Sequence, residues 1–89
     1  MKEKIIKVSN KMGIHARPAA MLVQTSSKFQ SNVKILKDDF EVDAKSIMGV
    51  MTLAAAMGSE LKFVAEGPDE SEVLQSIEAL FDSGFQENK

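Results

Sequence analysis

Cysteine, tryptophan and tyrosine are absent from this 89-residue sequence, and histidine occurs only once, as His15. Without cysteine, the chain forms no disulfide and offers no thiolate nucleophile or sulfur ligand for zinc or an iron–sulfur cluster. A lone imidazole does not make the paired-histidine sites of intracellular metalloenzymes, and no carboxylates have calcium-loop spacing. We therefore expect no metal ion, and a reducing, cytoplasmic setting suits the composition.

An excess of positive charge and a long apolar run are also missing. Eleven basic and thirteen acidic residues give a net charge of −2, the wrong sign for a chain whose main partner is nucleic acid. The N-terminal stretch MKEKIIKV lacks the apolar core of a secretion signal. The longest apolar run, 47–57, is interrupted by Gly49 and Thr52 and has about half of the roughly 20 residues that span a bilayer. We expect a cytoplasmic chain that is not exported, does not insert into a membrane and does not bind nucleic acid.

The hydrophobic pattern, with 44% hydrophobic and 27% charged residues, predicts one domain over residues 1–89. Period-two alternation predicts four strands, and helical spacing predicts three helices. The strands centre on residues 6–8, 33–35, 40–42 and 61–65, and the helices on 16–29, 47–57 and 73–81. The order β-α-β-β-α-β-α is typical of an α+β, open-faced α/β sandwich, in which a four-stranded, mainly antiparallel sheet has its helices on one face. The side chains expected to meet water on the other face are Lys7, Lys34, Glu41 and Lys62.

Two local patterns add detail to this fold. Asp38 and Asp39 form the expected hairpin turn between the second and third strands, although the lack of glycine leaves the turn type open. Asp69, followed three residues later by Glu72, predicts a capping box that opens the last helix after Pro68.

His15 stands where a nucleophile, a cation and a helix N-terminus coincide. Proline is tolerated in the first turn of a helix, so Pro18 indicates that the helix begins just after His15, with an exposed imidazole. The backbone amides of Ala16 and Arg17 and the helix dipole favour an anion attached to the ring. Arg17 adds a charge-assisted contact, and the positive field favours a neutral, nucleophilic imidazole. On spacing alone, a solvated or N-capping histidine beside an incidental arginine is the more common alternative.

A longer stretch of sequence around His15 favours the functional interpretation over this alternative. The octapeptide GIHARPAA, residues 13–20, resembles the active-site signature of the HPr family, the histidine-containing phosphocarriers of the bacterial phosphoenolpyruvate-dependent sugar phosphotransferase system. A second string, KSIMGVM at residues 45–51, resembles the regulatory segment of that family. The separation of the two strings and the order of the elements agree with the family over essentially the whole chain.

The resemblance implies a phosphoryl relay. His15 would accept a phosphoryl group on Nδ1 from phosphorylated enzyme I, itself charged by phosphoenolpyruvate, and pass it to enzyme IIA proteins for sugar uptake. Arg17 would steady the phosphate. Members of this family are carriers rather than enzymes, need no cofactor, and are expected to act as monomers; related regulatory paralogues lack the histidine.

Ser46 admits two interpretations that are compatible with each other. On local grounds it is an ordinary N-cap, a position that serine fills well. In the Gram-positive members that the chain resembles, the serine at this position is phosphorylated by an HPr kinase/phosphorylase, and the modified protein binds a catabolite-control repressor. A phosphate here would add about −1.5 to −2 charges at a helix N-terminus. A purely regulatory interaction module that acts through Ser46 is therefore the alternative to the carrier.

A partner-docking patch is expected beside His15, because relay partners bind briefly and methionine adapts to several surfaces. Its residues are Ala20, Ile47, Met48 and Met51, mainly Ile47 and Met48. Helical spacing assigns Val50 to the core. Enteric-type members tend to be basic at the positions of Gln24, Ser27 and Gly49, so the neutral residues here favour a Gram-positive-like surface.

An RNA-recognition domain is the rival from another class, because it shares the order β-α-β-β-α-β. Such a domain stacks bases on aromatic side chains of its open sheet face. This chain has only phenylalanine as an aromatic, and its five phenylalanines fall on expected core positions. The negative net charge also argues against nucleic acid, so this reading has little support.

Overall fold

A computed structural model describes residues 1–86. Residues 87–89, which the predicted domain 1–89 includes, lie outside the described residues. The elements are β1 (Lys2–Lys7), α1 (Ala16–Ser27), β2 (Asn32–Lys37), β3 (Phe40–Asp43), α2 (Ile47–Thr52), β4 (Glu60–Glu66), α3 (Glu70–Asp82) and a 3-10 turn, η1 (Gly84–Gln86). The predicted order β-α-β-β-α-β-α is confirmed. No helix within residues 1–86 has both the length and the apolar character needed to cross a bilayer.

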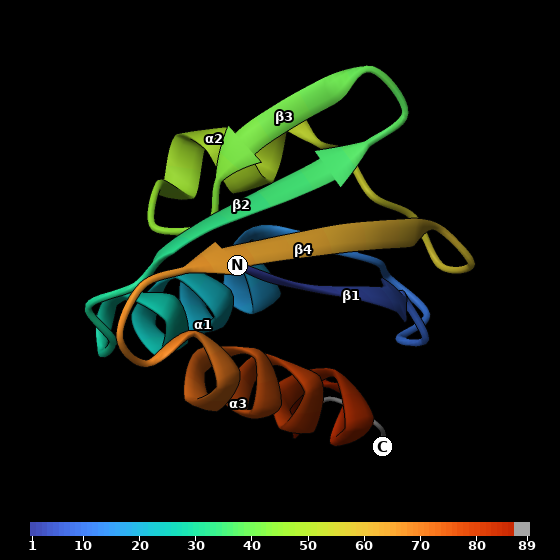
Figure 1. Ribbon diagram of the computed structural model, residues 1–89. Coiled ribbons are helices and arrows are strands. Elements are labelled where there is room, and N and C mark those ends of the chain that lie inside the picture. The colour runs from blue at the N-terminus through green and yellow to red at the C-terminus, as the bar shows by residue number, and fades with distance from the viewer. Residues whose placement is uncertain (87–89) are drawn as a thin grey trace.

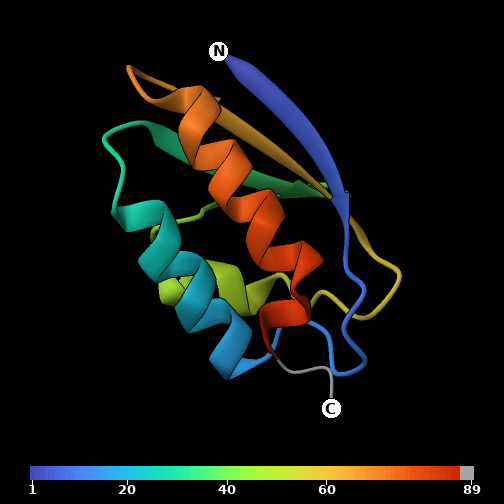
Figure 2. The same ribbon diagram turned by 90° about the horizontal axis from the view of Figure 1, so that it is seen from below.

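The four strands form one sheet in the order β1-β4-β2-β3, and all three pairings are antiparallel. Cross-strand partners place Ile6 opposite Leu61, and Ile35 opposite Phe63. The helices α1 and α3 cover one face of the sheet, and α2 lies beside the edge strand β3 (Figures 1 and 2). The predicted open-faced sandwich is therefore confirmed.

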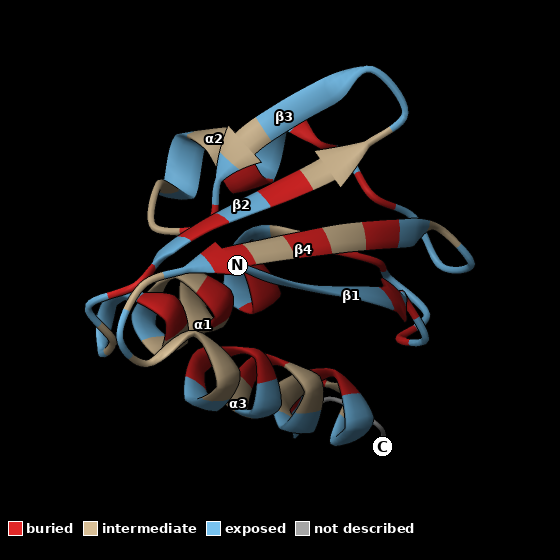
Figure 3. Cartoon of the chain, in the orientation of Figure 1, coloured by how far each residue is buried: buried red, intermediate tan, exposed pale blue. Residues whose placement is uncertain are grey.

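The core lies between the sheet and the helices (Figure 3). Leu61, Phe63 and Ala65 of β4 are fully buried, as their alternation predicts. Phe63 packs edge to face against Phe81 of α3, with ring centroids 5.6 Å apart. Phe81 makes a similar contact with Phe85 at 4.7 Å. These aromatic pairs join the central strand to the C-terminal helix.

Phe40 does not occupy the core position expected for it, because its side chain is 64% exposed. It lies at the turn end of β3, a four-residue strand at the edge of the sheet. α2 approaches β3 near Val42, and no helix of residues 1–86 covers the other end of the strand (Figure 1). The exposure follows from the short reach of α2 along β3, which strand alternation does not reveal.

The open face of the sheet carries the charged side chains expected there. Lys34 forms an ion pair with Glu41 across β2 and β3 at 3.1 Å, and Lys62 pairs with Glu3 of β1 at 3.2 Å. Lys7 is exposed on the same face. Solvent screens such pairs, so each one contributes at most about 1 kcal/mol to stability. Their main effect is to keep this face of the sheet polar and hydrated.

The hairpin between β2 and β3 closes through Asp38 and Asp39, as predicted. Lys37 and Phe40 are the last paired residues, so the connection has two residues. Asp38 has φ of +55°, a left-handed conformation that aspartate adopts more readily than most residues. This explains how the turn forms without glycine.

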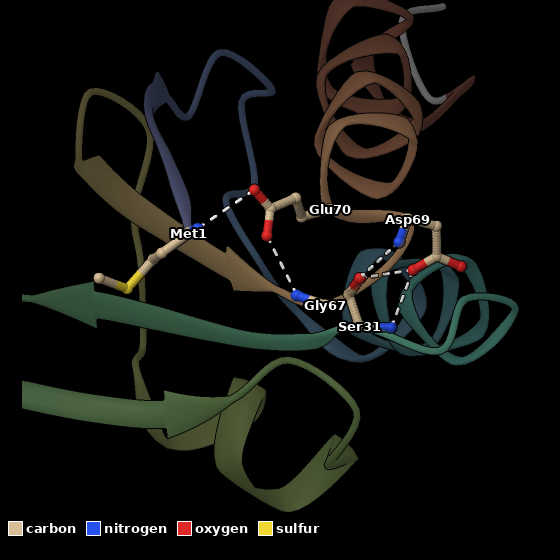
Figure 4. A network of polar contacts seen from close by, with 5 residues as sticks. All are labelled: Met1, Ser31, Gly67, Asp69 and Glu70. Atoms are coloured by element: carbon tan, nitrogen blue, oxygen red, sulfur yellow. Dashed lines mark hydrogen bonds and ion pairs between the residues drawn. The ribbon is translucent and has the colours of Figure 1, made fainter.

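The capping box expected at Asp69 and Glu72 is wrong. Asp69 does occupy the N-cap of α3, but its side chain caps no amide of that helix. Its carboxylate instead accepts hydrogen bonds from the amide and the hydroxyl of Ser31, the amide at 2.9 Å (Figure 4). It also accepts one from the Gln30 amide at 2.9 Å. The Asp69 amide donates to Ser31 Oγ at 3.1 Å, so Glu72 is not its partner.

These contacts join the start of α3 to the connection between α1 and β2. They form because β4 and β2 are neighbours, which brings segments 38 residues apart in the sequence together. The hydrogen bond from Ser31, followed by that from the Gln30 amide, lowers the pKa of Asp69 below its ordinary value of 3.8. Asp69, which local sequence assigns to the helix start, thus has a tertiary partner in Ser31 that the sequence did not reveal.

Candidate functional site

His15 occupies the N-cap of α1, as predicted. Its φ and ψ are −96° and −165°, an extended conformation, and its carbonyl accepts from the Ala19 amide at 2.9 Å. Pro18 is the third residue of the helix and is buried. Its missing amide hydrogen costs no intrahelical bond at this position. The local sequence therefore places the imidazole at the start of the helix.

The environment of the imidazole is less open than expected. His15 is half-buried, and its Nε2 atom is inaccessible to solvent. The loop before His15 packs on the segment after α2. The Ile14 amide donates to the Ala55 carbonyl at 2.8 Å, and the Ile14 side chain is buried.

The surroundings of His15 are suited to an anion. The first-turn amides of a helix have no acceptor within it, and the His15 side chain caps none of them. The first turn contains no acidic residue. Ala16 and Arg17 are exposed, and no carboxylate within residues 1–86 forms an ion pair with Arg17. The helix dipole and the guanidinium together make this end of α1 electropositive.

Ser46 is the N-cap of α2, as its local sequence predicts. Its Oγ accepts a hydrogen bond from the Gly49 amide at 3.2 Å, and its own amide donates to the Asp43 carbonyl at 3.0 Å. The residue is half-buried. The hydroxyl thus stabilises a helix of only six residues.

The side chains expected to form the docking patch differ in exposure. Met48 is 74% exposed, whereas Ile47 and Met51 are 41% and 42% exposed. Ala20 of α1 is half-buried, and α1 packs against α2. Val50 is fully buried, which confirms its assignment to the core. Three exposed side chains of α2 are therefore apolar.

Met12, which is not among the predicted site residues, is 76% exposed in the loop before His15. The sequence did carry a signal for this exposure, because Met12 stands between Lys11 and Gly13 in a polar loop, outside any apolar pattern. Within residues 1–86, no group of three or more histidine or carboxylate side chains is arranged to hold a metal ion.

Comparison with known proteins places this chain in a family. Residues 2–83 match the family model described as the PTS HPr component phosphorylation site. The phosphocarrier protein HPr of Treponema pallidum (strain Nichols) is 52% identical over 84 residues, which make up 94% of this chain and 96% of that protein.

Solved structures agree with this assignment. A crystal structure of HPr from Thermoanaerobacter tengcongensis matches with a TM-score of 0.96 and 48% identity, over 100% of both chains. Crh, the catabolite repression containing protein of Bacillus subtilis, matches with a TM-score of 0.69 and 41% identity, over 98% of this chain and 95% of that one. The Crh crystal structure is a dimer with a swapped domain. The chain is a member of the HPr family of phosphocarrier proteins.

Proposed function

We propose that His15 carries the phosphoryl group and that residues 1–89 form a single phosphocarrier domain. The observation that supports this best is the position of the imidazole at the N-cap of α1, directly before the exposed Arg17. The phosphoryl group would come from phosphorylated enzyme I and would pass to enzyme IIA proteins for sugar uptake. The protein is then a covalent carrier of the phosphoryl group, and its partners carry out the other reactions of the relay.

The geometry favours Nδ1 as the acceptor atom. Because Nε2 is buried, Nδ1 is the ring nitrogen left for an incoming phosphoryl group. The Nδ1 lone pair attacks phosphorus, and the bond from phosphorus to the enzyme I donor breaks with its electron pair returning to the donor. Onward transfer reverses these roles, because the phosphorus–nitrogen bond is itself reactive.

The phosphorylated ring is stabilised by groups already in place. The amides of Ala16 and Arg17 and the helix dipole favour the new anion, and the dipole contributes about 0.3 to 1 kcal/mol. The guanidinium of Arg17 steadies the phosphate oxygens through charge-assisted hydrogen bonds. Such modest stabilisation suits a relay, since a phosphoryl group held too tightly would not be passed on.

The test is to incubate the protein with enzyme I and radiolabelled phosphoenolpyruvate. We expect an acid-labile label, located at His15 by mass spectrometry of the intact phosphopeptide at alkaline pH. An inert His15 would leave the purely regulatory module acting through Ser46 as the better reading. A label on another residue would remove His15 from the relay.

Ser46 is proposed as a second, regulatory phosphorylation position. The support is its place as the N-cap of α2 next to the exposed Ile47 and Met48. An HPr kinase/phosphorylase would modify it, and a catabolite-control repressor would bind the modified chain. The apolar side chains proposed to dock enzyme I and enzyme IIA are Ala20, Ile47, Met48 and Met51.

The relay is proposed to operate in the cytoplasm, where phosphoenolpyruvate is made, with the chain as a monomer and with a Gram-positive-like surface. A monomer leaves the N-terminus of α1 and the exposed side of α2 open to partners. Size-exclusion chromatography with light scattering tests this state. A stable dimer at assay concentrations would instead favour an assembly like that of Crh.

A further inference from the structure

Asn10 is an inward-pointing polar residue in the loop that leads to His15. Asn10 is only 9% exposed, whereas its neighbours Ser9 and Lys11 are exposed. The Asn10 Nδ2 donates to the Gly13 carbonyl at 2.7 Å, and the Gly13 amide donates to the Asn10 carbonyl at 3.1 Å. These two hydrogen bonds close the loop over four residues.

Gly13 connects this closed loop to His15. Its carbonyl also accepts a hydrogen bond from the His15 amide at 3.1 Å, so Asn10 and His15 share one acceptor. Gly13 has φ of +69°, and a Cβ on it would lie only 2.4 Å from the Ala55 carbonyl oxygen. The next amide, that of Ile14, donates to the same Ala55 carbonyl at 2.8 Å. The orientation of the Gly13 carbonyl is therefore tied both to the loop and to the segment after α2.

We propose that Asn10 is a positioning residue for phosphoryl transfer at His15. By holding the Gly13 carbonyl, the Asn10 amide sets the direction of the His15 amide and thus the extended N-cap conformation from which the imidazole meets the first turn of α1. Without the Asn10 donor, the bond from the Ile14 amide to Ala55 still holds this peptide unit, but the Gly13 carbonyl tilts and the ring moves relative to the amides of Ala16 and Arg17. The inference rests on the proposed role of His15.

The experiment compares Asn10→Ala and Asn10→Leu with the parent. Both changes remove the Nδ2 donor, and leucine keeps the branching at Cγ and the number of side-chain heavy atoms. Asn32→Ala is the matched control, because Asn32 is an exposed asparagine of β2 on the open face of the sheet. The measurements are kcat and KM for phosphorylation by enzyme I, the ring nitrogen and Ala16 amide chemical shifts, and the melting temperature.

We expect a fall in kcat of roughly three- to tenfold in both Asn10 variants, with KM within about twofold of the parent, because orientation rather than docking is lost. The His15 ring nitrogens and the Ala16 amide should shift in the same variants, and Asn32→Ala should change neither readout. A purely structural role would instead lower the melting temperature and leave the kinetics of the folded fraction unchanged.

Folded Asn10 variants with the parent kcat and parent ring shifts would overturn the inference. Unfolding of both variants at the assay temperature would also overturn it, since Asn10 would then be a requirement of the fold. If the parent itself takes no label at His15, the proposed function fails, and the ring shifts alone decide whether Asn10 orients the imidazole.

Discussion

Replacing Ser46 separates its contribution as a helix cap from the effect of charge at this position. Ser46→Ala removes the hydrogen bond from the Gly49 amide to Oγ and should lower the free energy of unfolding by about 1 kcal/mol. For a domain of this size, about 1 kcal/mol corresponds to a fall in melting temperature of roughly 4 to 8 °C. Ser46→Asp keeps a capping acceptor, and the helix dipole favours its charge by about 0.3 to 1 kcal/mol, so its stability should equal or slightly exceed that of the parent.

The rate of transfer from enzyme I should not follow the order of stability. An anion at position 46 lies next to the exposed Ile47 and Met48, where a phosphorylated enzyme I would approach with an anion of its own. Ser46→Asp and kinase-phosphorylated protein should therefore be labelled more slowly at His15, whereas Ser46→Ala should be labelled at the parent rate. Asn32→Asp is the control, because it adds the same charge to the open face of the sheet.

The measurements are the initial rate of labelling by enzyme I and the melting temperature of each protein. Unchanged transfer in Ser46→Asp and in phosphorylated protein would leave Ser46 as a cap alone. A slower transfer accompanied by a large loss of stability would refute the docking argument in favour of local unfolding. Equal slowing in Asn32→Asp would show that net charge, rather than its place, is responsible.

Substitutions at four other residues test the site and the tertiary contacts. His15→Ala should remove all phosphoenolpyruvate-dependent label while circular dichroism still reports a folded domain, because the half-buried ring contributes little to the core; residual label elsewhere would contradict the assignment. Arg17→Ala should slow transfer without abolishing it, since the backbone amides remain, and Arg17→Lys should recover part of the rate because it restores the charge but not the planar fork; full activity in Arg17→Ala would make the guanidinium a bystander. Asp69→Ala should lower the melting temperature at pH 7, whereas Glu72→Ala should not, and both should keep the parent transfer rate. Because the folded-state pKa of Asp69 lies below 3.8, its ionised carboxylate stabilises the fold above that pH, and this stabilisation is lost as the pH falls through the folded-state pKa. An Asp69→Ala deficit that is equal at pH 7 and at pH 2 would refute this account.

Local chemistry allowed much of the site to be predicted before any tertiary contact was known. Pro18 restricts the helix start to the residues just before it, and this placed His15 at the N-cap of α1. Ser46 was also recognisable as a cap from its local sequence, because a serine hydroxyl can accept a hydrogen bond from a first-turn amide wherever the helix lies. The family resemblance then indicated the phosphoryl transfer that is proposed for His15.

The sequence by itself determined the order of the elements, the buried alternation of β4 and the position of His15, because each depends on backbone preferences within a few residues. Only the tertiary structure decided the partner of Asp69, the exposure of Phe40 and the burial of His15 Nε2. The first two depend on which distant segments become neighbours: β2 beside β4, and α2 along part of β3. A carboxylate or an aromatic ring looks the same in the sequence whichever segment it meets, so its role became definite only when the sheet brought these segments together.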